Sequence, residues 1–212
     1  MSDFRDSVRR FMAAEVLPNL EQWERDGELP RELHKKAGQL GLLGVGFPEG
    51  VGGGGGSLSD AIAVVEEMHY AGGSGGLVAS LLTCGIALPH IVAAGNEEQI
   101  ARWVGPTLEG ELIGALAITE PDGGSDVAGL RTTARRESDH LVVNGAKTYI
   151  TSGSRADFVT TAVRTGGPGA HGISLLVIER GTPGFAVSRK LSKMGGSALI
   201  RRSCRSPMSG CR

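Results

Sequence analysis

The chain is most informative at residues 117–129, which read AITEPDGGSDVAG. An apolar run leads here directly into a turn that holds Gly123, Gly124 and the hydroxyl of Ser125. Glycines lack a Cβ atom and permit positive φ, so their consecutive backbone N–H groups can converge on an anion. An Asp-Gly pair is also typical of a β-hairpin turn, and the spacing alone favours the hairpin.

A second informative segment lies at residues 144–153 and reads NGAKTYITSG. Its aromatic residue, Tyr149, stands between the hydroxyls of Thr148 and Thr151. Taken together, the two segments suggest a pocket for a ligand that has both a pyrophosphate and a flat ring.

The composition is that of an ordinary globular protein. The 212 residues have room for one large or two modest domains. Hydrophobic residues make up 40% and charged residues 21%, values that are usual for soluble proteins. The net charge of −1 and the aromatic content of 4% argue against a nucleic-acid partner.

Neither a targeting segment nor a membrane partner is expected. The N-terminal residues are polar and lack the apolar region of a signal peptide. The most apolar window, residues 77–94, is interrupted by polar residues and Pro89, which predicts a buried helix. The three cysteines have neither zinc-site nor disulfide-framework spacing, so a cytoplasmic location is expected.

The first half of the chain has the apolar spacing of helices. Pro18 is expected to end the first helix, Gly41 to stop the second, and Asn96 to cap the last. Helices are predicted at residues 4–16 and 30–40, after Ser57, and at residues 76–94 and 96–108.

Near residue 112 the pattern changes to short runs rich in Val, Ile and Thr, separated by glycine turns. Strands are predicted at residues 112–119, 131–136, 140–143, 147–150, 158–163, 173–178 and 185–189. We therefore expect an α+β multi-domain chain. Its parts are an all-α helical domain at residues 1–111, an incomplete small β-barrel domain at residues 112–199, and a non-native tail at residues 200–212.

Several other features have ordinary structural explanations. The glycine run at residues 50–55 formally matches a dinucleotide fingerprint, but no strand precedes it, so a mobile surface loop is expected. The five histidines show no metal-ligand spacing, and no metal is predicted. Glu120 is tempting as a catalytic base. Its place before Pro121 at a strand end indicates instead a carboxylate that holds backbone N–H groups.

Residues 118–126, ITEPDGGSD, together with residues 144–153, resemble the acyl-CoA dehydrogenase family. The resemblance covers residues 1–199, and GLLGV at residues 41–45 is similar to that family's N-terminal helical domain. It implies N-terminal helices, a middle β-barrel and a C-terminal four-helix bundle. It also implies FAD, an acyl-CoA substrate, an electron-transfer flavoprotein or similar acceptor, and a homo-oligomer, a dimer or tetramer, at full length. The implied reaction is α,β-dehydrogenation, in which a glutamate removes the α-proton and the β-hydride passes to flavin N5.

The resemblance also implies which residues bind the cofactor. They are Leu116, Ala117, Ile118, Thr119, Gly124, Ser125, Tyr149, Ile150 and Thr151. The first four resemble the strand along the isoalloxazine edge, where Thr119 would hydrogen-bond the ring. Gly124 and Ser125 would face the pyrophosphate, with Ser125 also near the acyl-CoA substrate. Residues 149–151 resemble the segment that packs on the flavin, with Thr151 near N5; many members have Trp where Tyr149 stands.

The end of the chain departs from the family pattern after about Gly195. We therefore expect these 212 residues to lack the C-terminal bundle, to supply no catalytic residue and to be inactive alone. The tail at residues 200–212 has four arginines, two of the three cysteines and no predicted strand or helix. A shifted frame with GC-rich codons can yield DTAELSFADVRVP, which is similar to a family strand, and this suggests a frameshift near residues 195–199.

Two alternatives to the dehydrogenase remain open. One is a non-catalytic fragment that binds flavin or CoA, which the missing base favours. The other is a related acyl-CoA oxidase or flavin monooxygenase on the same fold. The order Thr119-Glu120-Pro121 favours the dehydrogenase.

Overall fold

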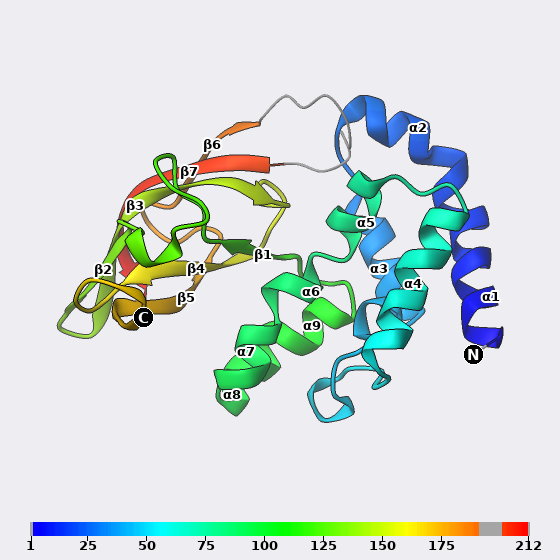
Figure 1. The fold of residues 1–212 in the computed structure, drawn as a ribbon, viewed down its shortest axis with the longest axis horizontal. Coiled ribbons are helices and arrows are strands. Elements are labelled where there is room, and N and C mark those ends of the chain that lie inside the picture. Colours follow the sequence, from blue (N-terminus) through cyan, green and yellow to red (C-terminus); the bar gives the residue numbers. More distant parts are fainter. Residues whose placement is uncertain (1, 191–200, 212) are drawn as a thin grey trace. The chain divides into compact units, whose positions relative to one another are not determined.

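The computed structural model describes residues 2–190 and 201–211, which fall into two compact units (Figure 1). The first unit holds the described residues up to Ile113 and is helical, and the second holds those from Gly114 on and is built of strands. The predicted α+β class, a helical domain followed by a small β domain, is confirmed.

The helical unit consists of short helices around an apolar interior that includes Val8, Met12, Met68 and Leu77. The α-helices are α1 Ser2–Phe11, α2 Leu17–Asp26, α3 Arg31–Gln39, α4 Leu58–Tyr70, α5 Gly75–Leu81, α6 Cys84–Ala87, α7 Pro89–Ala94, α8 Glu97–Gln99 and α9 Gly105–Leu108. Two π-helical segments, Met12–Val16 and Ile100–Val104, connect α1 to α2 and α8 to α9.

Pro18 does not end the first helix, and the prediction that it would is wrong. The chain continues from α1 through Met12–Val16 into α2, whose first turn contains Pro18. Leu17 N–H donates to Met12 O, five residues back. Because proline lacks an N–H and its ring crowds the carbonyl four residues earlier, the wider π turn accommodates it without a break.

Predicted helix ends are confirmed where capping side chains define them. Ser57 Oγ accepts the Asp60 N–H, and the Asp60 carboxylate accepts the Ser57 N–H, which forms a capping box before α4. Asn96 and Gln99 form the same arrangement before α8. Gly41, beyond α3, has a φ of 76°, a left-handed conformation that favours glycine.

The glycine run lies at the surface, as expected, and backbone hydrogen bonds connect it to the preceding segment. Gly54 N–H donates to Gly44 O, and Gly55 N–H donates to Phe47 O, each at 2.9 Å. A Cβ atom on Gly53 would lie 2.2 Å from Phe47 O, so a larger residue does not fit there.

The apolar window at residues 77–94 forms three helices, α5, α6 and α7, where a single helix was predicted. Leu77, Leu81, Leu88 and Ile91 are buried, as expected of a core segment. Among the described residues, no single helix has the length and hydropathy to cross a membrane. One bent pair, Gly75–Leu81 with Cys84–Ala94, passes that test by length and composition alone.

In its described residues, the second unit forms one mixed sheet of seven strands. They are β1 Gly114–Ala117, β2 Thr133–Glu137, β3 His140–Thr151, β4 Phe158–Arg164, β5 Ile173–Glu179, β6 Ala186–Lys190 and β7 Arg201–Cys211. Their order is β1-β4-β2-β3-β7-β6, with β5 paired to β4. β1 and β4 run parallel, whereas β2–β3 and β4–β5 are antiparallel. The strands predicted at residues 140–143 and 147–150 are one continuous strand, β3.

The sheet curves around a small apolar core. In Figure 1, β3, β7 and β6 form one layer of the second unit, and β1, β4 and β5 form another. Phe185 packs against both buried clusters, one around Ala117 and Ile150 and the other around Val143 and Ile178. This core fixes β1 and β3, whose ends carry the predicted site.

The prediction that the tail has no strand is wrong. β7 pairs antiparallel with β3 over most of its length, and Arg202–Arg205 also pair with β6. Main-chain ladder bonds do not depend on an alternating side-chain pattern, which the tail lacks. Pro207, unusual inside a sheet, lies beyond the stretch that β6 pairs.

Candidate functional site

The two informative segments of the sequence meet in the structure. Thr148 N–H donates to Thr119 O at 2.9 Å, and Lys147 Nζ donates to Ile118 O at 2.9 Å. These bonds join the end of β1 to β3. The strand predicted along a ring edge therefore lies beside the segment that carries Tyr149.

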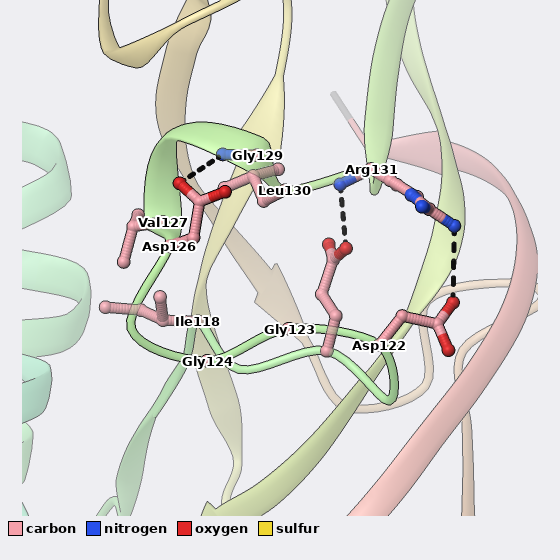
Figure 2. Close-up of a pocket in the computed structure, with 10 residues that line it drawn as sticks. Ile118, Asp122, Gly123, Gly124, Asp126, Val127, Gly129, Leu130 and Arg131 are labelled. Carbon is pink, nitrogen blue, oxygen red and sulfur yellow. Dashed lines mark hydrogen bonds and ion pairs between the residues drawn. The ribbon is translucent and has the colours of Figure 1, made fainter.

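A small cavity opens inside the 121–130 loop that follows β1. It has a volume of about 150 Å³ (Figure 2). Its lining comprises Ile118, Glu120, Asp122, Gly123, Gly124, Asp126, Val127, Gly129, Leu130 and Arg131. Figure 2 shows Asp126 bonded to Gly129 N–H and Asp122 paired with the Arg131 side chain. Both aspartates are thus engaged within the loop.

The hairpin interpretation is correct for the first four residues of this region. Glu120 N–H donates to Gly123 O at 2.8 Å, and Gly123 N–H donates to Glu120 O at 3.2 Å. Neither Gly123 nor Gly124 has a positive φ, so the alternative, an anion nest of left-handed glycines, does not form here. The reciprocal bonds close the turn with ordinary backbone angles instead.

Gly124 and Ser125 nevertheless present unused donors. Within the part of the chain that the structure describes, their backbone N–H groups and the Ser125 hydroxyl donate to no acceptor. A Cβ atom on Gly123 would meet nothing within 4 Å, and one on Gly124 only Thr119 Cγ2 at 3.8 Å. Contacts within the protein therefore do not explain these two glycines, whereas a closely approaching ligand would.

Glu120 holds the far end of the loop. Its buried carboxylate accepts Arg131 N–H at 2.7 Å, Thr132 N–H at 2.8 Å and Lys147 Nζ at 2.9 Å. This confirms the expectation that it binds backbone N–H groups. Burial by itself raises the pKa of Glu120, but the Thr132 side chain, Lys147 and the two backbone N–H groups outweigh it and lower that pKa to about 2.

Tyr149 projects from an irregular point of β3. Its φ is 59°, and the pairing with β7 shifts register between Lys147 and Ile150. Tyr149 as a residue is 58% exposed, whereas Ile150 is buried in the core. A bulge of this kind re-aims a side chain, here toward solvent.

The remaining predicted residues flank this point. Leu116, Ile118, Thr119 and Thr151 are half-buried, and Ala117 is buried in the same core cluster as Ile150. Ala117 and Ile150 can therefore reach a surface ligand only through their main chains. A ligand at this surface would meet the backbone N–H groups of Gly124 and Ser125, the Ser125 hydroxyl and the ring of Tyr149.

Two residues that sequence reasoning missed organise the site, Lys147 and Arg164. Lys147 shares the inward face of β3 with Val143, so the strand alternation could have predicted its burial. Burial lowers the pKa of Lys147, and the Glu120 carboxylate partly offsets that effect. Arg164 gives no signal in the sequence for its part in the site, because the carbonyls of Ala128 and Leu130 that it binds there lie more than 30 residues earlier. Across the described residues, no three His, Cys, Asp or Glu side chains gather as metal ligands would.

Comparison with known proteins gives the same family for both units. The model for "Acyl-CoA dehydrogenase, N-terminal domain" matches residues 2–111, and the model for the middle domain matches residues 115–205. The mitochondrial long-chain specific acyl-CoA dehydrogenase of Sus scrofa is 43% identical over 195 residues, which is 91% of this chain and 45% of that protein. The chain spans about half the length of the curated relatives it matches.

Solved structures agree with this result. A candidate acyl-CoA dehydrogenase of Mycobacterium smegmatis is 60% identical with a TM-score of 0.95, covering 97% of this chain and 54% of that one. A glutaryl-CoA dehydrogenase of Mycobacterium smegmatis, solved in complex with FADH2, is 30% identical with a TM-score of 0.87. The match covers 98% of this chain and 52% of that one.

Proposed function

Because the chain belongs to the acyl-CoA dehydrogenase family, we propose that it carries the flavin- and acyl-CoA-binding surface of an FAD-dependent dehydrogenase. The enzyme would convert an acyl-CoA thioester to the 2-enoyl-CoA. Since the chain spans about half the length of its relatives, the activity is proposed for a protein that also has the part corresponding to their other half.

The observation that carries this proposal is the set of unused donors at Gly124 and Ser125. They lie near Thr119, because a Cβ atom built on Gly124 would be 3.8 Å from Thr119 Cγ2. Thr119 in turn is bonded to the strand that exposes Tyr149. Backbone N–H groups and a hydroxyl suit an anionic pyrophosphate, and an exposed aromatic face with nearby hydroxyls suits a flat ring. The residues present therefore fit FAD.

Bound FAD would accept the hydride from the β-carbon of the acyl group. The contribution of the chain is to bind and orient. Gly124 and Ser125 would hold the pyrophosphate, with Ser125 also near the acyl-CoA. The side chains of Thr119 and Thr151 would donate to the ring and tune its electronics, while residues 116–118 and Ile150 line its edge.

The α-proton needs a base, and Glu120 is unsuited to that role. Its oxygens already accept three hydrogen bonds, and its pKa of about 2 makes it a poor proton acceptor. We propose that the base lies in the part that corresponds to the relatives' other half. On this proposal, residues 1–212 alone bind ligand without turnover, which is the second candidate function.

Four further properties are proposed on the family resemblance and the sequence. The electron acceptor would be an electron-transfer flavoprotein or a similar protein. The full-length enzyme would be a dimer or tetramer. It would be located in a reducing cytoplasm. Fatty acid metabolism is the setting that an acyl-CoA substrate suggests. The frameshift hypothesis for residues 195–199 stays a prediction, and sequencing of the coding DNA tests it.

Flavin binding tests the proposal directly. Purified chain is titrated with FAD, and the visible spectrum and flavin fluorescence are recorded. We expect a saturable spectral shift without bleaching when acyl-CoA is added anaerobically. Bleaching by acyl-CoA would contradict the proposed lack of turnover, and the absence of FAD binding would contradict the proposed site.

A further inference from the structure

The segment at residues 128–132, where the 121–130 loop ends, is held from two sides by side chains outside it. On one side, the Glu120 carboxylate accepts the N–H groups of Arg131 and Thr132. On the other, the Arg164 guanidinium donates to Ala128 O at 2.6 Å and to Leu130 O at 3.1 Å. An acceptor and a donor thus fix N–H and C=O groups of one short segment.

Arg164 is well placed to act as a fixed support. It ends β4, where it pairs with Ile173 of β5, and its own N–H donates to Thr132 O at 2.7 Å. Its Nη1 donates to Gly167 O at 2.7 Å and to Gly169 O at 3.0 Å. All three guanidinium nitrogens therefore bond main-chain carbonyls, and the group bridges the 121–130 loop to the turn at residues 167–169.

The surroundings of Arg164 leave room for its planar guanidinium group. A Cβ atom on Gly172 would lie 2.9 Å from Arg164 Nη1 and still closer to Gly167 O, so a side chain there would displace the guanidinium. A lysine could not reproduce the bonds, because it offers one nitrogen in place of three. The arrangement thus requires the planar geometry of arginine.

We propose that Arg164 is a positioning residue for ligand binding at Gly124 and Ser125. It reaches neither residue but, with Glu120, fixes the loop segment that follows them. This inference rests on the proposed function of the loop. The physical reason is that a loop ordered before binding does not have to lose conformational freedom when the ligand arrives.

The test compares Arg164→Met and Arg164→Lys with Arg136→Met. Arg136 is an exposed arginine of β2 that has no partner among the described residues, so its replacement controls for loss of one positive charge. Amide hydrogen exchange of residues 129–132 reports on the loop, and titration with FAD reports on binding. If Arg164→Met does not fold, Arg164→Lys provides the same comparison.

In Arg164→Met we expect exchange at residues 129–132 to rise about tenfold while β5 stays protected, and FAD binding to weaken by roughly tenfold. Arg164→Lys should fall between this variant and the wild type, and Arg136→Met should change neither readout. Unchanged exchange, or faster exchange with unchanged FAD binding, would overturn the positioning role. If Arg164→Met speeds exchange at residues 129–132 but the wild type binds no FAD, Arg164 still orders the loop, and the proposed function is wrong.

Discussion

Lys147 Nζ lies 2.9 Å from Glu120 Oε1, and both side chains are almost fully buried. The ammonium also donates to Ile118 O, while the carboxylate also accepts two backbone N–H groups. A buried ion pair is tolerated when further hydrogen bonds satisfy both charges, as they do here. The pair connects β3 to both ends of the 121–130 loop.

Replacing Lys147 with Met should destabilise the second unit strongly. The substitution leaves the Glu120 carboxylate buried without its cation, a loss that typically costs about 3–5 kcal/mol. Urea unfolding measures the free energy, with Lys35→Met as the matched control because Lys35 pairs with Glu111 at an exposed site. The control should cost less than about 1 kcal/mol. Equal decreases in the free energy of unfolding of the two variants would show that the buried pair stabilises the protein no more than the exposed pair does.

Glu120 should also make the free energy of unfolding depend on pH in the acidic range. Its pKa in the folded protein, about 2, lies below the ordinary value near 4.5, so its stabilising effect is present above pH 4.5. That effect is lost as the pH falls from about 5 to 2, because the unfolded chain binds the proton more readily. Glu120→Gln should remove this part of the pH dependence, on the order of 3 kcal/mol.

The control for this prediction is the wild-type curve itself, measured from pH 7 to pH 2 beside that of Glu120→Gln. Glu67 and Asp60 also have lowered pKa values, Glu67 through its bonds to Arg9 and Arg5 and Asp60 through its bonds to Ser57, so both curves will fall. Only the difference between them belongs to Glu120. Parallel curves would contradict the assignment.

Gly124→Ala should separate ligand binding from stability. An added methyl would find only Thr119 Cγ2 within 4 Å, at 3.8 Å, so the free energy of unfolding should change by less than about 0.5 kcal/mol. The same methyl occupies the surface proposed for the pyrophosphate and should weaken FAD binding by about tenfold or more. Thermal unfolding and FAD titration provide the two readouts.

Gly53→Ala gives the opposite pattern and serves as a matched comparison. Its methyl would meet Phe47 O at 2.2 Å, so it should destabilise the helical unit although Gly53 has no proposed ligand. If Gly124→Ala lowers stability as much as Gly53→Ala does, the protein itself requires both glycines, and the argument for a ligand at Gly124 is lost.

Much of the secondary structure could be predicted because its determinants are local. The strands follow from short Val-, Ile- and Thr-rich runs, and the starts of α4 and α8 follow from capping residues three positions apart. The helix end predicted at Pro18 was wrong because the effect of a proline depends on whether the preceding turn can widen. The sequence gives no sign of β7, because main-chain pairing with β3 does not require an alternation of apolar and polar side chains.

The candidate site was predictable only in part, for a related reason. The sequence alone identifies the possible donors at Gly124 and Ser125 and the aromatic ring of Tyr149. Arg164 and Lys147 act through carbonyls about 30 residues away, and such partners become visible only when the sheet is assembled. The role of Glu120 could be predicted because its place before Pro121 indicated a carboxylate that binds backbone N–H groups, as it does with Arg131 and Thr132.

Tyr149 combines an exposed ring with a left-handed backbone, and two variants separate these features. Tyr149→Gly and Tyr149→Ala both remove the ring, so both should weaken FAD binding, whereas Tyr149→Phe should keep it. With its φ of 59°, this position costs any residue with a Cβ atom about 1 kcal/mol. The Gly variant should therefore be more stable than the Ala variant by about that amount in urea unfolding. An Ala variant as stable as the Gly variant would show that this backbone is unstrained, and unchanged FAD binding in both would remove Tyr149 from the proposed site.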